Sequence, residues 1–398
     1  MTDPDLPPPV WVDTPAGLAA LVADLSIQPA IAVDTESNSL HAYREQVCLI
    51  QFSTPQIDYL LDPLAISDTA RTPPLAGHTR SGAGLQSLAP IFADPNIEKV
   101  FHAAEYDLIC LSRDFGWQVR SLFDTMVAVR TLGWPSHGLA AVLESQFGVK
   151  LNKRHQRANW AARPLTPDQL AYARLDTHYL IPLRHQLRQA LDQSGYWAEA
   201  KEEFDRLCQI NGLNGRTLLQ FDPQNFWHIS GARDLAGREA ATLRELYIYR
   251  DQCARRLNRP PFKVISDSTL LAIAKAQPHS LADLAPLPGM TPNQIHRHGH
   301  PILQTVARGH KAPIPRPLRI EHEDEAVLER YEALRKWRKQ KAQKRGVESD
   351  VIIPRDVLLE LARRAPQSAA DLNSVPGLGP TRRAKYGDEI VQLLNPQA

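Results

Sequence analysis

The sequence has few cysteines, no long hydrophobic run and no strong excess of one charge. Its four cysteines, Cys48, Cys110, Cys208 and Cys253, form no C-x-x-C pair, so neither a disulfide framework nor a zinc site is indicated. No apolar stretch approaches the roughly 18 residues that span a bilayer, and MTDPDLPPPV lacks the features of a signal peptide. We therefore expect a cytoplasmic protein without membrane segments. The net charge of +2 argues against a wholly basic nucleic-acid-binding surface.

Length and composition are those of a globular protein of two or three domains. The first half alternates between β-rich and amphipathic stretches, which predicts an α/β domain with a mixed sheet flanked by helices. We expect strands at 10–12, 30–33, 47–52, 57–61 and 99–101, and helices at 14–25, 85–92, 104–115 and 166–192. The Ser-Thr-Pro turn after residue 52 indicates a hairpin, and Thr166 followed by Pro167 marks a helix start. Beyond residue 122 the pattern is helical throughout.

The second half contains an internal repeat with a constant offset of 88 residues and no gap. The matching pairs include Leu270-Leu271 with Leu358-Leu359, Asp283-Leu284 with Asp371-Leu372, and Pro288-Gly289 with Pro376-Gly377. Each copy predicts a helical unit of roughly 80 residues that is able to fold alone. Between the copies, the proline-rich APIPRPL at 312–318 predicts a stiff, extended spacer.

The stretch IAVDTESNSL at 31–40 runs from three apolar residues into two acids. Side chains in a strand alternate faces, so Asp34 and Glu36 project to the same side if the strand continues through them. Two charges about 4 Å apart repel by roughly 4 kcal/mol at an effective dielectric near 20, so the pair requires a proton, a basic partner or a cation. Taken alone, this short motif could also be a strand end where the acids meet water.

Two later segments place further acids in apolar surroundings. KVFHAAEYDLICL at 99–111 puts Asp107 one turn into a helix that follows a strand, where the polar face of an amphipathic helix is the alternative interpretation. LAYARLDTHYL at 170–180 spaces Tyr172 and Asp176 four residues apart on a helix. These two side chains therefore share a face and can act at one point. The order of the three acidic segments is more specific than any one of them.

In this order, the segments resemble the three motifs of the DEDDy 3′–5′ exonuclease superfamily. LFDTMVAVRTLG at 122–133 and LNKRHQRANWAARPLTPDQLAYARLDTHYLIPL at 151–183 resemble its ribonuclease D branch, and the two repeat copies resemble HRDC domains. The resemblance covers about residues 10–394. It implies a ribonuclease H-like α/β exonuclease domain followed by two all-α HRDC domains. No G-x-x-x-x-G-K-[ST] motif occurs, which excludes the RecQ-type helicases that also carry HRDC domains, and we expect no ATP binding.

Carried over by position, the resemblance implies that Asp34, Glu36, Asp107 and Asp176 bind two divalent cations and that Tyr172 is the catalytic tyrosine. Asp34 would bridge both ions, Glu36 and Asp176 would complete the first site, and Asp107 would serve the second, partly through water. Oxygen-only ligands favour Mg²⁺ or Mn²⁺. Two ions about 3.5–4 Å apart can activate water and stabilise the leaving oxygen of a phosphodiester, while Tyr172 orients that water. Bound cations would relieve the repulsion within the Asp-x-Glu pair.

Other residues near these motifs have two possible roles. Asp124 fits a family position near the site, but it is equally suited to cap the helix that it precedes. His102, at a strand end, is expected to be structural. Arg174 and Leu175 stand where many relatives carry small or acidic residues, which leaves the spacing of Tyr172 and Asp176 intact.

Substrate contacts are expected in two regions. Lys153, Gln156 and Trp160 lie in the family-like run, where a loop could hold the terminal nucleotide by stacking and phosphate contact. The second repeat copy carries the glycine turn VPGLGPTRRAKYG at 375–387 and the basic run RKWRKQKAQKR at 335–345, both of which suit phosphates. The RNA-contacting residues expected there are Arg338, Lys339, Arg382 and Arg383. A packing turn and a solvated helix face are the alternatives, and the first copy is expected to be mainly structural.

We thus expect an exonuclease domain at 1–208, HRDC domains at 209–308 and 321–398, and a linker at 309–320. The implied activity is that of a metal-dependent 3′–5′ exoribonuclease that releases 5′-mononucleotides. The implied substrates are transfer-RNA precursors with 3′ trailers, and a monomer is expected. A DNA exonuclease with the same site is one competing interpretation, because carboxylates and cations recognise phosphates rather than sugars. A non-catalytic RNA-binding scaffold is the other, and the presence of all four acids and the tyrosine disfavours it.

Overall fold

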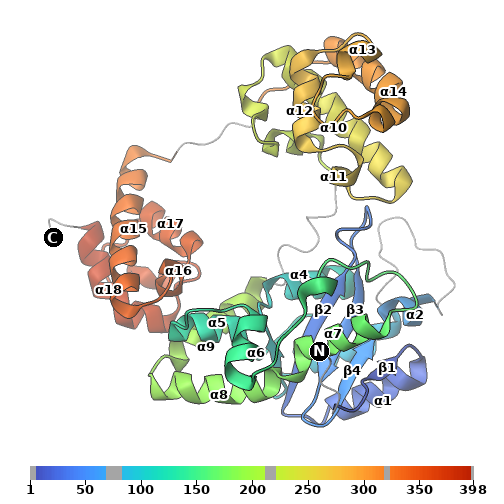
Figure 1. The fold of residues 1–398 in the computed structure, drawn as a ribbon. Coiled ribbons are helices and arrows are strands. Elements are labelled where there is room, and N and C mark those ends of the chain that lie inside the picture. The colour runs from blue at the N-terminus through green and yellow to red at the C-terminus, as the bar shows by residue number, and fades with distance from the viewer. Residues whose placement is uncertain (1–5, 69–82, 211–220, 318–322, 396–398) are drawn as a thin grey trace. The chain divides into compact units, whose positions relative to one another are not determined.

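Six strands form one mixed sheet in the computed structural model of the protein (Figure 1). In chain order they are β1 (Val10–Val12), β2 (Ala30–Ser37), β3 (Val47–Ser53), β4 (Asp58–Leu61), β5 (Glu98–Phe101) and β6 (Leu122–Asp124). Their order across the sheet is β1-β4-β3-β2-β5-β6. The central strand β2 pairs antiparallel with β3 and parallel with β5, and β5 pairs parallel with β6. The predicted mixed α/β sheet and the 47–61 hairpin are therefore confirmed.

The structure describes residues 6–68, 83–210, 221–317 and 323–395. By its internal contacts the chain divides into two units. The first comprises Met1–Ser37, Val47–Arg216 and His322–Ala398, and the second comprises Asn38–Gln46 and Thr217–Glu321. The domain junctions predicted near residues 209 and 321, and the end of the predicted linker from residue 318, border or fall outside the described residues.

Helices pack on the sheet of the first unit and bury the side chains of its strands. The helices up to residue 210 are α1 (Pro15–Leu25), α2 (Pro63–Asp68), α3 (Ala89–Ala93), α4 (Glu105–Phe115), α5 (Thr125–Leu132), α6 (Leu139–Phe147), α7 (Pro167–His178), α8 (Leu180–Gln193) and α9 (Trp197–Ile210), with 3₁₀ turns η1 (Ala83–Leu88) and η2 (Lys153–His155). The core beneath them includes Phe92, which stacks on Trp117 with ring centroids 4.8 Å apart. All seven residues of β3 are buried, as expected of a strand covered on both faces.

The two helical copies reproduce each other element by element. In the second unit the helices are α10 (Gly237–Leu257), α11 (Pro261–Val264), α12 (Asp267–Ala276), α13 (Leu281–Leu284) and α14 (Pro292–Lys311), preceded by η4 (Pro223–His228) and η5 (Ala232–Asp234). In the first unit the corresponding elements are α15 (Glu325–Arg345), α16 (Ser349–Ile352), α17 (Arg355–Arg364), η6 (Asp371–Ser374) and α18 (Pro380–Leu394). Each of α15, α16, α17 and α18 begins 88 residues after its counterpart, which confirms the repeat. Gly289 and Gly377 occupy the same turn with φ of 83° and 75°, a conformation that favours glycine.

Three sequence predictions about elements differ from the structure. Residues beyond 122 are not helical throughout, because Leu122–Asp124 is an edge strand that pairs with β5. The helix predicted from 166 to 192 is two helices separated at Tyr179. Pro182 explains this break, because it has no N–H to donate to the carbonyl of residue 178 and its ring obstructs that turn. The predicted helix at 85–92 is a 3₁₀ turn followed by the short α3.

Within the part of the chain that the structure describes, no helix is both long and apolar enough to cross a membrane. All four cysteines are free, and Cys48, Cys110 and Cys253 are buried.

Candidate active site

The strand β2 continues through both acids of the Asp-x-Glu motif, so that Asp34 and Glu36 project to one side. Asp34 pairs in register with Gln51 of β3, and Glu36 pairs with Leu49. The register shifts between Glu36 and Ser37, which is a bulge directly after the second acid. Bulges bend a strand and end regular pairing. The two carboxylates therefore sit where the central strand leaves the sheet.

Asp107 reaches the same place because β5 runs parallel to β2. Parallel strands end at the same edge of a sheet, and three residues separate the end of β5 from the start of α4. Asp107 lies in the first turn of α4 and is buried, although it is an acid. The hydroxyl of Thr35, the residue between the two acids of β2, donates a hydrogen bond to Asp107 Oδ1. This bond links the first two motifs directly.

Tyr172 and Asp176 lie on α7, which packs on β2, β3 and β4 (Figure 1). A capping box between Thr166 and Gln169 begins this helix, as the sequence predicted for Thr166. The side chain of Arg174 donates to Asp58 Oδ2 at 2.7 Å and thereby ties α7 to β4. His178 Nδ1 lies 2.9 Å from the same oxygen. These bonds fix the rotation of α7, so Tyr172 and Asp176 face the acids of β2.

Ser53 and Thr177 add a second tie between α7 and the sheet. Their hydroxyl oxygens are 2.7 Å apart, and Ser53 also donates to Asp58 Oδ1 at 2.7 Å. Arg174, which departs from the family pattern, is thus a buried anchor of the helix and leaves the Tyr172–Asp176 spacing unchanged.

Burial raises the pKa of all four carboxylates, and the charges of other acids in the set raise it further for Asp34, Glu36 and Asp176, which places the four in one electrostatic cluster. Burial is the largest cause for Asp34, whose pKa lies well above its usual range, followed by the charges of Asp107, Asp176 and Glu36. Burial, then the charges of Asp176 and Asp107, raise the pKa of Glu36 to about 9. Mainly because of burial, the pKa of Asp176 rises to about 8 and that of Asp107 to about 7. Without a cation, this cluster retains protons near neutral pH.

Tyr172 remains a neutral phenol in this environment. Burial raises its pKa most, and the charges of Asp176, Glu36 and Asp34 raise it further. Its hydroxyl is hydrogen-bonded to the Asp176 carboxyl, and that bond lowers the pKa of Asp176. A tyrosine that stays protonated can donate a hydrogen bond, but it cannot act as a base.

The donor set consists of carboxylate oxygens, which suit Mg²⁺ or Mn²⁺ better than Zn²⁺. Among the described residues, no three acidic, histidine or cysteine side chains are gathered tightly enough to hold a metal ion as they stand. The clustered acids therefore fit a divalent cation in their chemistry, and some of their side chains must turn to bind one. A cation would replace the protons that the cluster otherwise retains.

The Asp124 carboxylate caps α5 and also accepts hydrogen bonds from the turn before α4. Its Oδ1 accepts hydrogen bonds from the backbone N–H groups of Met126 at 2.8 Å and Val127 at 3.1 Å. It also accepts from Ala103 N at 3.1 Å and Ala104 N at 2.7 Å. Ala103 has a φ of 63°, a strained conformation at the entry to α4. The predicted cap is confirmed, and the same carboxylate holds the turn that presents Asp107.

His102 has a structural role, as expected. Its Nδ1 lies 2.9 Å from the hydroxyl of Thr125, which donates to the carbonyl of Phe101 at 3.0 Å. Burial lowers the pKa of His102 to about 4, so the imidazole is neutral near pH 7.

The three substrate-contact candidates before α7 fall into two groups. Lys153 and Gln156 are exposed around η2, where a substrate could reach them. Trp160 is 1% exposed and lies in a cluster with Leu49, Leu60 and Ala173, so it has no free face for a nucleotide. Its ring lies 5.9 Å from that of Tyr172 and supports the tyrosine instead. His155, which the sequence did not single out, approaches Tyr172 edge-on at 6.1 Å.

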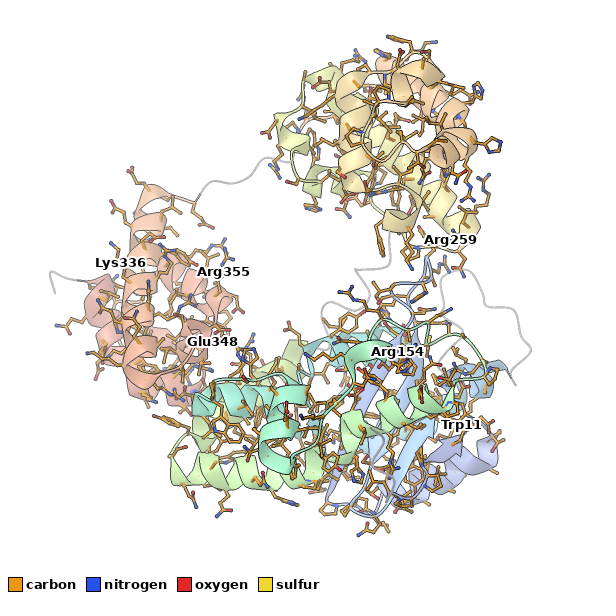
Figure 2. All side chains as sticks on the ribbon, in the orientation of Figure 1. Trp11, Arg154, Arg259, Lys336, Glu348 and Arg355 are labelled. Atoms are coloured by element: carbon orange, nitrogen blue, oxygen red, sulfur yellow. The ribbon has the colours of Figure 1, made fainter. Side chains whose placement is uncertain are left out.

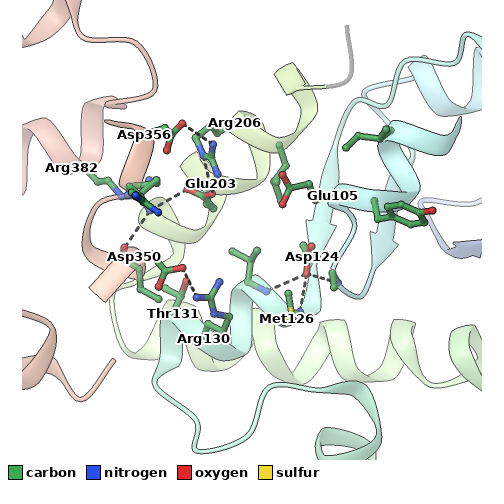
Figure 3. Close-up of a pocket in the computed structure, with 18 residues that line it drawn as sticks. Glu105, Asp124, Met126, Arg130, Thr131, Glu203, Arg206, Asp350, Asp356 and Arg382 are labelled. Carbon is green, nitrogen blue, oxygen red and sulfur yellow. Dashed lines mark hydrogen bonds and ion pairs between the residues drawn. The ribbon is translucent and has the colours of Figure 1, made fainter. Parts of the chain in front are cut away.

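The glycine turn of the second repeat copy is occupied by a carboxylate of the same unit. Glu202 on α9 accepts hydrogen bonds from Thr381 N at 2.8 Å and from Arg382 Nη1 at 3.0 Å. Arg382 also lies 3.3 Å from Glu203 and is only 2% exposed (Figure 3). The prediction that Arg382 contacts RNA does not agree with this arrangement, because Glu202 takes the place that a phosphate would fill.

The basic residues of α15 lie partly on the buried face of the helix and partly on its exposed face. Arg345 pairs with the buried Glu199, and Arg338 donates to the carbonyl of Ile353 at 2.8 Å. Arg383 is half-buried and donates to the carbonyl of Leu378 at 3.0 Å. The outward face carries the exposed residues Lys336 (Figure 2), Lys339 and Lys344. Of the basic residues predicted to contact RNA in this copy, Lys339 is exposed and Arg338 and Arg383 are half-buried.

A cleft of about 630 Å³ lies beside Asp124 and is lined by side chains of α4, α5, α9, α16 and α17 (Figure 3). Several of its charged groups form ion pairs across the cleft. Arg130 lies 2.5 Å from Asp350, and Arg206 lies 3.6 Å from Asp356. This pairing holds the second repeat copy against α5 and α9, so the cleft belongs to a packing interface of the first unit.

The site combines a mixed sheet, acids at the end of β2 and in the first turn of α4, and a helix that carries Tyr-x-x-x-Asp. This combination defines a nuclease of the 3′–5′ exonuclease class. Comparison with known families agrees. A 3′–5′ exonuclease family model matches residues 9–192, and an HRDC domain model matches residues 239–306 and 327–394.

Ribonuclease D of Escherichia coli is 31% identical over 312 residues, which are 77% of this chain and 77% of that protein. The crystal structure of that ribonuclease D superposes with a TM-score of 0.68 at 26% identity and covers 98% of this chain and 99% of that one. The chain belongs to the ribonuclease D family and is a hydrolase of the exoribonuclease type. The exosome complex exonuclease RRP6 of Saccharomyces cerevisiae is 34% identical over 280 residues, which are 68% of this chain but 36% of RRP6.

Proposed function

We propose that the chain uses divalent cations held by Asp34, Glu36, Asp107 and Asp176 to remove nucleotides one at a time from the 3′ end of RNA and release 5′-mononucleotides. The observation that carries this proposal is that four buried carboxylates from β2, α4 and α7 have raised pKa values, which for Asp34, Glu36 and Asp176 come partly from the charges of other acids in the set. Burying several carboxylates side by side lowers the stability of the fold. A protein that retains such a cluster therefore has a use for a bound cation there.

We propose two ions, with Asp34 shared between them, Glu36 and Asp176 completing one site and Asp107 serving the other. When bound, divalent cations would supply charge that lowers the pKa of a water and stabilises the leaving oxygen of the phosphodiester. Asp176 is held in place by α7, whose rotation the Arg174–Asp58 bond fixes.

Tyr172 would orient the attacking water by donating or accepting one hydrogen bond as a neutral phenol. The raised pKa of this tyrosine supports the neutral form. The rings of Trp160, at 5.9 Å, and His155, at 6.1 Å, lie against its ring. The exposed Lys153 and Gln156 are proposed to contact the terminal nucleotides.

For substrate class, we propose structured RNA with a single-stranded 3′ tail, including transfer-RNA precursors with 3′ trailers. The relative from Escherichia coli is described as an exoribonuclease involved in structured RNA processing, which supports this choice. Lys339, with the neighbouring Lys336 and Lys344, is proposed to contact the RNA backbone, and Arg338 and Arg383 would contribute through their exposed edges. A monomer acting in the cytoplasm completes the proposal.

The test uses end-labelled RNA with a 3′ overhang and a DNA oligomer of equal sequence, each with Mg²⁺, Mn²⁺ or EDTA. Wild type should shorten the RNA from its 3′ end only with a cation, and Asp176→Asn should lose this activity. Asp168→Asn is a matched control, because Asp168 lies on the same helix but is exposed. Full activity in EDTA or in Asp176→Asn would contradict the cation-dependent mechanism, and faster digestion of the DNA would contradict the RNA substrate.

A further inference from the structure

Gln51 carries a side-chain amide that is fully buried. It lies in the middle of β3 with 0% of its surface exposed. Neither Nε2 nor Oε1 has a partner among the described residues. A glutamine side chain offers two N–H donors and a carbonyl acceptor, and buried polar groups in folded proteins are nearly always paired. An orphaned amide in the central part of a sheet therefore indicates a partner that this state of the protein lacks.

The strand register places this amide beside the candidate active site. Gln51 is directly opposite Asp34 in the antiparallel pair of β2 and β3. Residues directly opposite each other project to the same face, with Cβ atoms about 4.5–5.5 Å apart. Of the four clustered acids, Asp34 is thus the one that lies directly opposite Gln51 in the sheet.

The neighbours of Gln51 show that this face is the one that α7 covers. Leu49 and Ser53 share its face, because each is two residues away along β3. Leu49 belongs to the cluster that contains Tyr172 and Ala173 of α7. Ser53 lies 2.7 Å from Thr177, the residue after Asp176. The amide therefore lies between the sheet and the helix that completes the acid cluster.

We propose that Gln51 is a positioning residue, which donates a hydrogen bond from its amide to the Asp34 carboxylate when that carboxylate holds a cation. This inference rests on the proposed function. The acids are clustered but not closed around an ion, so some carboxylates must turn on binding. A donor fixed opposite Asp34 would hold the turned carboxylate and direct its other oxygen outward. Hydrogen-bond partners of metal-ligating side chains typically contribute 10- to 100-fold to metal affinity.

The test compares Gln51→Met with wild type in the full chain, using Mn²⁺ binding measured by titration calorimetry. Methionine fills a similar volume without donors, so we expect Mn²⁺ to bind about 10- to 100-fold more weakly. In EDTA, the variant should unfold at the wild-type temperature or above it, because an unpaired amide has been removed. Ile50→Val on the same strand is the control, because it faces the opposite side. Wild-type Mn²⁺ affinity in Gln51→Met would overturn the proposal.

A second measurement does not depend on the variant being folded. In crystals of the wild-type protein grown with Mn²⁺, we expect Gln51 Nε2 within about 3.2 Å of an Asp34 carboxylate oxygen. A water between them, or an amide turned away from Asp34, would contradict the proposal. Asp34→Asn separates this inference from the proposed function. If wild type and Asp34→Asn bind Mn²⁺ equally, the cation site itself is wrong. If only Gln51→Met matches wild type, the site stands and Gln51 has no part in it.

Discussion

Replacing Asp107 by asparagine should stabilise the protein at alkaline pH when no cation is present. Asparagine has the same shape, and its carbonyl oxygen can still accept the hydrogen bond from Thr35. The substitution removes only the charge that burial and neighbouring acids oppose. An increase in stability on loss of a proposed metal ligand is a specific expectation of an acid cluster that lacks its cation.

The magnitude follows from the shift in the pKa of Asp107 from 3.8 to about 7. Each unit corresponds to about 1.4 kcal/mol, so full ionisation costs the folded state on the order of 4 kcal/mol. Because the pKa is raised in the folded state, wild type loses this stability as the pH rises from about 4 through about 7, and the loss is complete above that window. The advantage of Asp107→Asn should therefore be small at pH 4.5 and full at pH 8.5. For a unit of this size, it corresponds to a rise in melting temperature of roughly 10 °C.

The assay is thermal unfolding followed by circular dichroism in EDTA at pH 4.5 and pH 8.5, repeated with Mg²⁺. The cation should stabilise wild type more than Asp107→Asn, because ligand binding stabilises the protein in proportion to what it binds and the variant lacks the carboxylate proposed for the second ion. Asp168→Asn is the control for removing an exposed charge from the same unit. Asp107→Asn that is less stable than wild type at pH 8.5 in EDTA, or a difference that does not change with pH, would refute the reasoning.

Three further predictions concern Tyr172, the lysines of α15 and Arg382. Tyr172→Phe should lower kcat by about 10²- to 10⁴-fold with an unchanged KM, measured on 3′-tailed RNA; a wild-type kcat would remove the hydroxyl from the mechanism. The triple change Lys336→Gln, Lys339→Gln and Lys344→Gln should reduce the slope of log K for RNA against log salt by about 2, whereas Lys341→Gln, whose ammonium group is 2.6 Å from Glu389, should change it little; equal slopes would exclude the outer face of α15. Arg382→Leu leaves Glu202 and Glu203 without their buried partner and should destabilise the first unit by about 3–5 kcal/mol in denaturant unfolding, whereas a change below about 0.5 kcal/mol would show that the pairing is not made in solution.

The sequence predicted well those features that depend on local patterns. The repeat, the Thr166 cap and the hairpin rest on composition and spacing within short windows, and the structure contains all three. The convergence of Asp34 and Asp107 could also be anticipated, because a strand-to-helix turn after a parallel neighbour ends at the same sheet edge.

Features that depend on packing could not be read from the sequence. Three residues are too few to show strand alternation, so β6 is recognisable only from its pairing with β5. Trp160 and Arg382 resemble nucleic-acid contacts in sequence, yet both are buried against other parts of the first unit. Gln51 carries no signal of its own, because its importance comes from the register with Asp34. The break at Tyr179, by contrast, follows from Pro182, because proline cannot donate the hydrogen bond that would continue the helix.

The most direct test of the account is the location of bound Mn²⁺ by anomalous X-ray scattering in crystals of the wild-type protein. We predict two anomalous peaks enclosed by the carboxylates of Asp34, Glu36, Asp107 and Asp176, and their loss in Asp34→Asn. An absence of density between these four side chains at saturating Mn²⁺, with RNA trimming intact in the same preparation, would contradict the central claim.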